Sequence, residues 1–192
     1  AVLPGSREGV IRRNLPWMLD TLGPLRAHAP DVDVVVLQAT EEHRELIEGI
    51  AVGHDVRLAV GDLHGELARA RAAFAVSGTI LTDVLHHRLP TVALYRVTKR
   101  IESFIYEHVF TTPYFPSTNL LAGREVIPEY SFRGEGPRPQ VANDVLLAFD
   151  DDATRKRCAG DLEVAAARLG PAGAISRAAG HVLHLASGGL DG

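Results

Sequence analysis

Short apolar runs alternate with longer amphipathic stretches through the first half of the chain. The run at residues 34–37 is apolar at every position, which is typical of a strand buried on both faces of a parallel sheet. Strands are expected at residues 1–3, 33–37, 56–60, 72–76 and 91–95, and helices at 7–28, 41–50, 63–71 and 79–87. This alternation favours right-handed βαβ units, so the sequence predicts an α/β fold with a Rossmann-like doubly wound parallel sheet.

The rhythm changes after residue 95. Apolar residues return at helical spacing at Ile101, Phe104, Ile105 and Val109. Two prolines predict loop or extended chain over residues 111–119, and a Gly- and Pro-rich polar stretch predicts a surface loop over 131–139.

The last part of the chain is predicted to be helical. Three consecutive aspartates at 150–152 are expected to cap a helix that runs to about residue 169, where Gly170 and Pro171 end it. A final helix is expected at 174–185. We therefore divide the chain into a Rossmann-like domain at 1–140 and C-terminal helices at 141–192 that pack on it.

Charge and cysteine content narrow the classes of function. The 192 residues carry a formal net charge of −4 with scattered arginines, so no nucleic-acid partner is expected. Cys158 is the only cysteine, which excludes a disulfide framework and a cysteine-based metal site and favours a reducing compartment. No apolar run approaches the roughly 20 residues of a membrane-spanning helix, and no secretory signal is visible.

The nine histidines do not suggest a metal site. His86 and His87 are adjacent, so they should face different sides of a helix. His181 and His184 lie three residues apart without an accompanying acidic ligand motif. We predict no metal.

The turn at residues 3–7 is the first candidate for ligand binding. In an open parallel sheet, ligands bind beyond the carboxyl ends of the strands. Gly5 lets the backbone approach a ligand, Ser6 can cap the next helix, and Arg7 offers a planar fork for phosphate oxygens beside the positive helix N-terminus. The plainer interpretation is an ordinary turn with a serine cap and a solvated arginine.

Two further segments fall at expected strand ends or loops. Ser77, Gly78 and Thr79 lead into a helix, and Asp83 follows one turn later, where it could accept hydrogen bonds from ribose hydroxyls or simply complement the helix dipole. Asn119 lies in a polar cluster and can donate and accept at once, as sugar or phosphate recognition requires. An asparagine turn in a loop is the alternative for it.

Together these segments resemble the C-terminal, nucleotide-sugar-binding domain of the lipid-A-disaccharide synthase family. The matching pieces are LPGSR at 3–7, VSGT at 76–79, Tyr95-Arg96 after a strand, NLLAGR at 119–124 and VIPE at 126–129. Their order and approximate spacing match as well.

The resemblance implies one half of a GT-B fold, in which two Rossmann-like domains face a cleft. It implies an inverting glycosyltransferase that moves a diacylglucosamine unit from UDP to an acylated glucosamine 1-phosphate in lipid A biosynthesis, without cofactor or metal. By that resemblance the substrate-binding residues are Gly5, Ser6 and Arg7 for the diphosphate, Ser77, Gly78 and Thr79 likewise, Asp83 for the ribose, Asn119 for the donor, together with Tyr95 and Arg96.

The family's proposed catalytic carboxylate belongs to an N-terminal acceptor domain, which is absent from this chain. The chain opens without an initiator methionine, so we expect a fragment that is inactive alone. A cytoplasmic location is expected. The stripe at 101–109 leaves open a peripheral contact with the inner membrane, with a buried core face as its alternative, and a homodimer is also left open.

Three departures from the family pattern stand out. Asp83 replaces the usual Glu, Thr118 a common Pro, and Phe132 the usual Gln. Two other functions therefore stay open. One is a UDP-N-acetylglucosamine 2-epimerase-like enzyme, which the ordered LPGSR and NLLAGR segments argue against. The other is a non-catalytic nucleotide-sugar-binding module, which Asp83 and Phe132 support.

Overall fold

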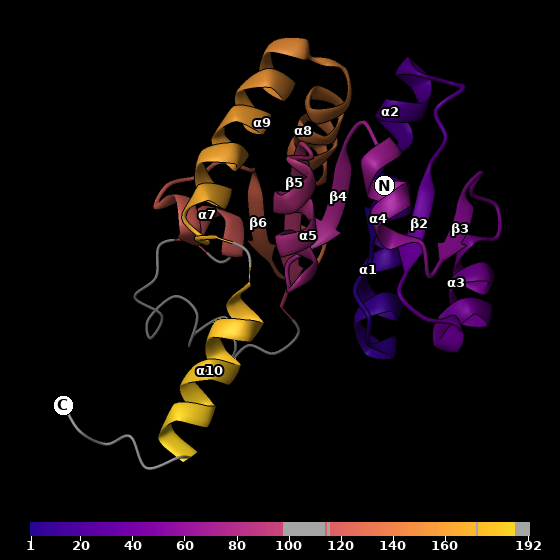
Figure 1. Ribbon diagram of the computed structural model, residues 1–192. Helices are drawn as coiled ribbons and strands as arrows, with labels where there is room; N and C mark the ends of the chain where they lie inside the picture. Colours follow the sequence, from indigo (N-terminus) through magenta and orange to yellow (C-terminus); the bar gives the residue numbers. More distant parts are fainter. Residues whose placement is uncertain (98–113, 115, 172, 187–192) are drawn as a thin grey trace.

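Six parallel strands form a single sheet in the computed structural model, which describes residues 1–97, 114, 116–171 and 173–186 (Figure 1). The strands are β1 (Val2–Leu3), β2 (Val35–Gln38), β3 (Arg57–Val60), β4 (Ala73–Val76), β5 (Thr91–Arg96) and β6 (Glu129–Phe132). Their order across the sheet is β3-β2-β1-β4-β5-β6, with β1 beside both β2 and β4. The predicted doubly wound α/β sheet is confirmed.

Alternate residues of the strands supply two separate hydrophobic cores. Val2, Val36 and Phe74 face one side, where they pack against α1 (Glu8–Thr21), α2 (Gly23–His28), α3 (Arg44–Ala51) and α8 (Arg138–Asp150). Leu3, Leu37 and Ala75 face the other side, where α4 (Leu63–Arg69), α5 (Ile80–His87) and α9 (Asp152–Ala167) cover them. Burial on both faces explains why these strands read as unbroken apolar runs.

All five predicted strands are present, but the sixth was missed. Strand β6 begins two residues before the predicted 131–139 loop and pairs with β5 through Ala93 and Glu129. It is a four-residue edge strand whose residues are half-buried or exposed, so it lacks the apolar signal of the central strands.

Several helix boundaries differ from the predicted ones. The helix predicted at 7–28 is divided at Leu22, after which Pro24 occupies the first turn of α2. The helix predicted at 41–50 opens as a 3₁₀ turn, η1 (Glu41–His43), before α3.

The loop predicted at 111–119 is described only at residue 114 and from residue 116 onward, and this prediction and that of a loop at 131–139 were both wrong where a helix begins. Helix α7 (Ser117–Ala122) starts directly after Pro116, and α8 starts at Arg138 with Pro139 in its first turn. Proline is compatible with a helix start because the first helical N–H groups need no partner within the helix. The apolar stripe at 101–109 lies outside the described residues.

The C-terminal helices differ in how they pack. Helix α9 begins at an Asp151 cap that accepts from the Thr154 amide, and it buries Cys158, Leu162 and Ala165. The Cys158 thiol contacts the Val126 carbonyl at 3.5 Å, and burial raises the pKa of this thiol to about 11. Helix α9 therefore holds the segment that leads into β6.

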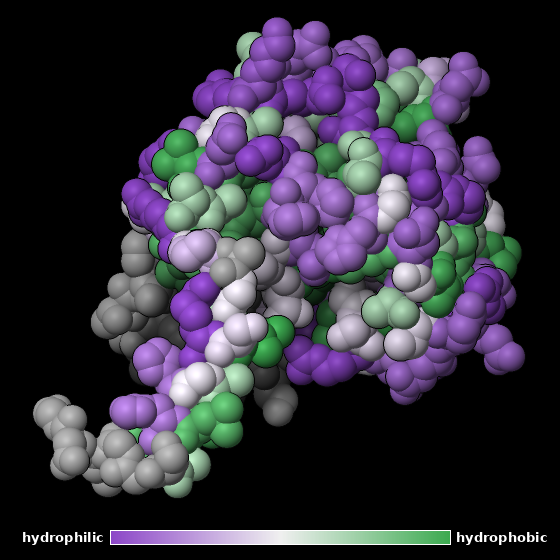
Figure 2. All heavy atoms as spheres, viewed as in Figure 1, coloured by the Kyte–Doolittle hydropathy of each residue, from purple (hydrophilic) through white to green (hydrophobic). Residues whose placement is uncertain are grey.

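Helix α10 (Ala174–Ala186), by contrast, has no buried residue and projects from the body of the domain (Figures 1 and 2). Ile175, Val182 and Leu183 on it are all largely exposed. Within the part of the chain that the structure describes, no helix is long and apolar enough to cross a membrane.

Candidate functional site

The turn between β1 and α1 lies at the carboxyl edge of the sheet. Gly5 has φ of +96°, and a Cβ at this position would lie 2.7 Å from Cγ1 of Val10, so only glycine fits without strain. Ser6 and Arg7 are exposed. The predicted serine cap was wrong, because Arg7 occupies the N-cap position and makes no capping hydrogen bond with its side chain. The first amides of α1 thus keep their capacity for an external acceptor.

The turn between β4 and α5 lies next to the first one. The Ser77 amide donates to the Leu94 carbonyl at 2.8 Å, which ties the turn to β5. Gly78 and Thr79 are exposed, and Thr79 occupies the N-cap of α5 without a side-chain capping bond. Because β1 and β4 are neighbours while the chain winds outward from them in opposite directions, these two turns flank the topological switch point of the sheet.

Asp83 lies on α5 and faces α4. Its Oδ1 is 3.9 Å from Nε2 of His64, and its side chain is 35% exposed. His64 in turn places Nδ1 3.0 Å from Nε2 of His87. The pKa of His87 is lowered by burial and by the neighbouring His64 and His86. Asp83 therefore has solvent access beside an imidazole cluster.

This imidazole cluster was not expected from the sequence. His86 and His87 face different directions, with ring planes at 90°, yet His64 from α4 approaches both of them. Among the described residues, however, no group of three or more His, Cys, Asp or Glu side chains is arranged to hold a metal ion.

Tyr95 and Arg96 end β5 and point to opposite sides of the sheet. Tyr95 lines a cavity of only about 20 Å³ together with Ser77, Pro116 and Ser131. The structure thus brings two of the predicted site residues, Ser77 and Tyr95, to the same place.

Arg96 reaches to the side of the sheet that α1 covers. Its guanidinium donates to the Arg13 and Gly134 carbonyls and lies over the rings of Trp17 and Phe132, 5.8 and 5.9 Å from their centroids. Burial lowers the pKa of Arg96. The contacts of Arg96 therefore join α1 to the chain that follows β6.

Asn119 is in the interior, away from the exposed turns. Its side chain is fully buried and makes four hydrogen bonds. Oδ1 accepts from the Val126 and Ile127 amides at 2.8 and 3.1 Å, while Nδ2 donates to the Ile127 carbonyl and to Glu129. An amide with these four partners anchors the chain that enters β6, and the contact of Asn119 with the nucleotide sugar stays a prediction.

Gln38 is a polar residue of this edge that the sequence interpretation missed. It is the last residue of β2, is only 5% exposed, and donates from Nε2 to the Gly5 carbonyl at 2.9 Å. The sequence does contain a signal for Gln38, because it is a polar residue at the end of an otherwise apolar run. Its target could not be read from the sequence, because 33 residues separate the two partners.

Comparisons with known proteins assign the chain to a family. The family model for lipid-A-disaccharide synthetase matches residues 1–167. The chain belongs to the lipid-A-disaccharide synthase family. Lipid-A-disaccharide synthase of Myxococcus xanthus (strain DK1622) is 35% identical over 187 residues, 96% of this chain and 48% of that protein. The enzyme of Pseudomonas fluorescens (strain Pf0-1) is 36% identical over 131 residues, 67% of this chain and 35% of that protein.

A solved structure supports the fold of this synthase-family chain. The crystal structure of the GtfA/B complex matches with a TM-score of 0.50 at 13% identity, covering 86% of this chain and 31% of that one. At such low identity the likeness concerns the fold alone. The chain also spans 48% of the length of the Myxococcus synthase and 35% of the length of the Pseudomonas enzyme.

Phe132, where the sequence resemblance leads us to expect Gln, has a packing role in the structure. The Phe132 ring packs on Trp17 with centroids 5.0 Å apart, and Arg96 lies over both rings. Gly136 follows with φ of +59°, and a Cβ there would lie 2.2 Å from the Phe132 ring. Phe132 therefore belongs to an aromatic cluster that fixes the chain after β6.

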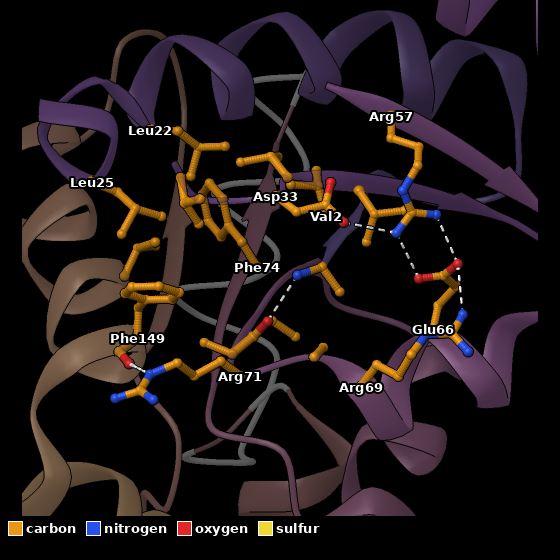
Figure 3. Close-up of a pocket in the computed structure, with 18 of the residues that line it drawn as sticks. Val2, Leu22, Leu25, Asp33, Arg57, Glu66, Arg69, Arg71, Phe74 and Phe149 are labelled. Carbon is orange, nitrogen blue, oxygen red and sulfur yellow. Dashed lines mark hydrogen bonds and ion pairs between the residues drawn. The ribbon is translucent and has the colours of Figure 1, made fainter. Parts of the chain in front are cut away.

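A cavity of about 380 Å³ lies at the amino ends of the strands, opposite the two turns (Figure 3). Leu22, Leu25, Phe74 and Phe149 line its apolar side, and Arg57 binds Glu66 on the other. None of the predicted site residues lines this cavity. Since ligands of open parallel sheets bind at the carboxyl ends of the strands, the two exposed turns remain the better candidate site.

Proposed function

We propose that this chain binds the UDP-sugar donor of an inverting glycosyltransferase of the lipid-A-disaccharide synthase type. The observation that carries the proposal is the pair of exposed, uncapped turns at the switch point, Ser6-Arg7 and Gly78-Thr79, in a chain of this family. Two helix N-termini and one guanidinium at a single edge suit a diphosphate, which carries negative charge and many acceptor oxygens.

Each side chain of the site has a proposed task. Arg7 and the amides around Ser6 would contact one phosphate, and the amides around Thr79 the other. Asp83, with 35% of its side chain exposed, would accept from the ribose hydroxyls. Tyr95 would close the site from β5, where it already lies beside Ser77.

The donor domain supplies only part of the proposed reaction. The whole enzyme would transfer a diacylglucosamine unit from UDP to an acylated glucosamine 1-phosphate, with the acceptor and the catalytic carboxylate held by an N-terminal domain. Because donor, acceptor and base must be held within reacting distance, this chain alone should bind UDP without transferring sugar. A cytoplasmic enzyme in peripheral contact with the inner membrane would meet both lipid-linked substrates.

Calorimetry with UDP tests the proposal. We expect saturable binding of UDP by the 192-residue chain, weaker binding of uridine, and no disaccharide when an acylated glucosamine 1-phosphate and the UDP-linked donor are both supplied. Disaccharide formation by this chain, or the absence of any preference for UDP over uridine, would contradict the proposal.

A further inference from the structure

Gln38 lies beneath the β1–α1 turn rather than in it. Its side chain is 5% exposed at the end of the apolar strand β2, and Nε2 donates to the Gly5 carbonyl at 2.9 Å. Burying an amide costs free energy unless it finds a partner, so the Gly5 carbonyl is the group that makes a glutamine acceptable here.

The bond to Gly5 determines the direction of the next amide. In a trans peptide group the carbonyl and the N–H point in opposite directions. Strand β1 has β2 on one side and β4 on the other. If the Gly5 carbonyl is held toward Gln38 on the β2 side, the Ser6 N–H is turned toward the β4 side, where the Gly78-Thr79 turn lies.

We propose that Gln38 is a positioning residue for the diphosphate. This inference rests on the proposed function, and it assigns to Gln38 the task of keeping the Ser6 N–H aimed at the space between the two turns before a ligand arrives. Gly5 has the positive φ that lets the peptide group adopt this orientation, and Gln38 holds it there. A hydrogen-bond donor that is already aligned loses no binding free energy to being ordered when the ligand binds.

The role of Gln38 is specific to phosphate. The Ser6 amide would meet a phosphate oxygen, whereas the uracil and ribose would be held elsewhere in the site. Loss of the Gln38 bond should therefore weaken ligands that carry a diphosphate and leave the bare nucleoside unaffected.

The test compares UDP and uridine binding to Gln38→Met. Methionine keeps the length and the burial of the side chain but cannot donate to Gly5. We expect UDP to bind about fivefold to tenfold more weakly, as loss of one hydrogen bond implies, and uridine to bind as before. Thr91→Val is the matched control, since it deletes a buried hydroxyl that donates to the Leu89 carbonyl at the start of β5, and UDP affinity should not change.

A second variant protects the test against a folding defect. Gln38→Leu is also apolar, leaves no unpaired amide in the buried site and cannot donate to Gly5, so it should show the same selective loss for UDP even if the methionine variant does not fold. Unchanged UDP affinity in the folded variants, or equal losses for UDP and uridine, would overturn the positioning role. Failure of the unaltered chain to bind UDP would instead overturn the proposed function, and the positioning role with it.

Discussion

Arg57 lies at the amino end of a strand and Arg7 beyond the carboxyl end of another, and their surroundings differ. Arg57, at the amino end of β3, donates to both carboxylate oxygens of Glu66 at 2.7 and 2.9 Å and to Asp33 at 2.9 Å. Arg7, beyond the carboxyl end of β1, is exposed at the start of a helix with no side-chain cap. The first arginine is neutralised within the fold, and the second faces solvent.

The same difference separates neighbouring helices. Helix α4 has its own cap, because the Asp62 carboxylate accepts from the Gly65 amide at 3.2 Å. Helices α1 and α5, which follow the two candidate turns, have no side-chain cap. A cap would compete with a phosphate for the same amides, so the absence of a cap leaves the first amides of α1 and α5 able to bind an anion. Helices α2, α3, α7 and α8 also have no side-chain cap, so it is the position of α1 and α5 at the switch point that distinguishes them. The contrast teaches that stability and ligand affinity should respond to different substitutions.

Asn119→Ala should produce the largest effect, on stability. It removes the acceptor of two buried backbone amides, those of Val126 and Ile127, and should lower the free energy of unfolding by about 3–4 kcal/mol. Denaturant unfolding measures this. Thr118→Val is the control, because the Thr118 hydroxyl is buried without a hydrogen-bond partner among the described residues, and it should cost below about 0.5 kcal/mol. Similar losses in the two variants would contradict the anchoring role of Asn119.

Glu66→Gln should lower the free energy of unfolding by about 2 kcal/mol, since it removes the charge from a carboxylate that is only 9% exposed and that pairs with the partly exposed guanidinium of Arg57. The Arg57 hydrogen bonds, followed by those of Arg69, lower the pKa of Glu66 from 4.5 to about 2. A lowered folded-state pKa gives stabilisation that is complete above about pH 4.5 and is lost as the pH falls toward about 2.

Urea unfolding at several pH values tests the Glu66 prediction. Over this acidic window the unaltered chain should lose more stability than Glu66→Gln, which has no carboxyl group to protonate at that position. Parallel pH profiles for the two chains would show that the carboxylate of Glu66 does not contribute as proposed. UDP affinity at neutral pH should be the same for both.

Arg7→Ala should act on binding instead of stability. Loss of a charge-assisted contact should weaken UDP by about 2 kcal/mol and leave uridine nearly unchanged, because uridine has no phosphate. Arg12→Ala is the matched control, an exposed arginine of the same helix that bonds Glu8 at 2.7 Å. If both variants lose UDP affinity equally, the effect is one of general charge, and Arg7 has no specific contact.

Asp83→Asn should give the smallest change, a loss of about 1 kcal/mol in UDP affinity if the carboxylate holds the ribose. Asp83→Glu should be tolerated, since it keeps a carboxylate that can accept from the ribose hydroxyls. The same calorimetry on both variants, with a melting curve for each, separates binding from stability. An unchanged dissociation constant in Asp83→Asn, with a slightly lower melting temperature, would assign Asp83 to the helix dipole alone.

The sequence predicted the parts of the fold that local patterns encode. The apolar run at 34–37 and the helix that follows Gly78 could be recognised because burial on two faces and helical spacing leave periodic signals. Strand β6 escaped because an edge strand of four half-buried or exposed residues has no such signal. The start of α7 escaped because Pro116 suggested a loop, although proline also begins helices.

The two candidate turns were predictable in a similar way, while their role in binding stays a prediction. Gly5 and Gly78 were identified because strand-to-helix turns are local features. The partners of Gln38 and Asn119 could not be predicted from residue type. The partner of Gln38 lies 33 residues away in the sequence, and the partners of Asn119 lie up to 10 residues away, so both depend on how the chain folds. Arg96 was expected to contact the ligand, yet its described contacts are with the chain's own carbonyls and rings.

Cys158 gives the chain a built-in reporter. It is the single cysteine, it is buried in α9 against the Val126 carbonyl, and its raised pKa keeps it protonated at neutral pH. A thiol reagent can reach it only when α9 separates from the segment leading into β6. The ratio of its alkylation rate to that of a free thiol therefore measures how often this layer opens, at one site and without any introduced label.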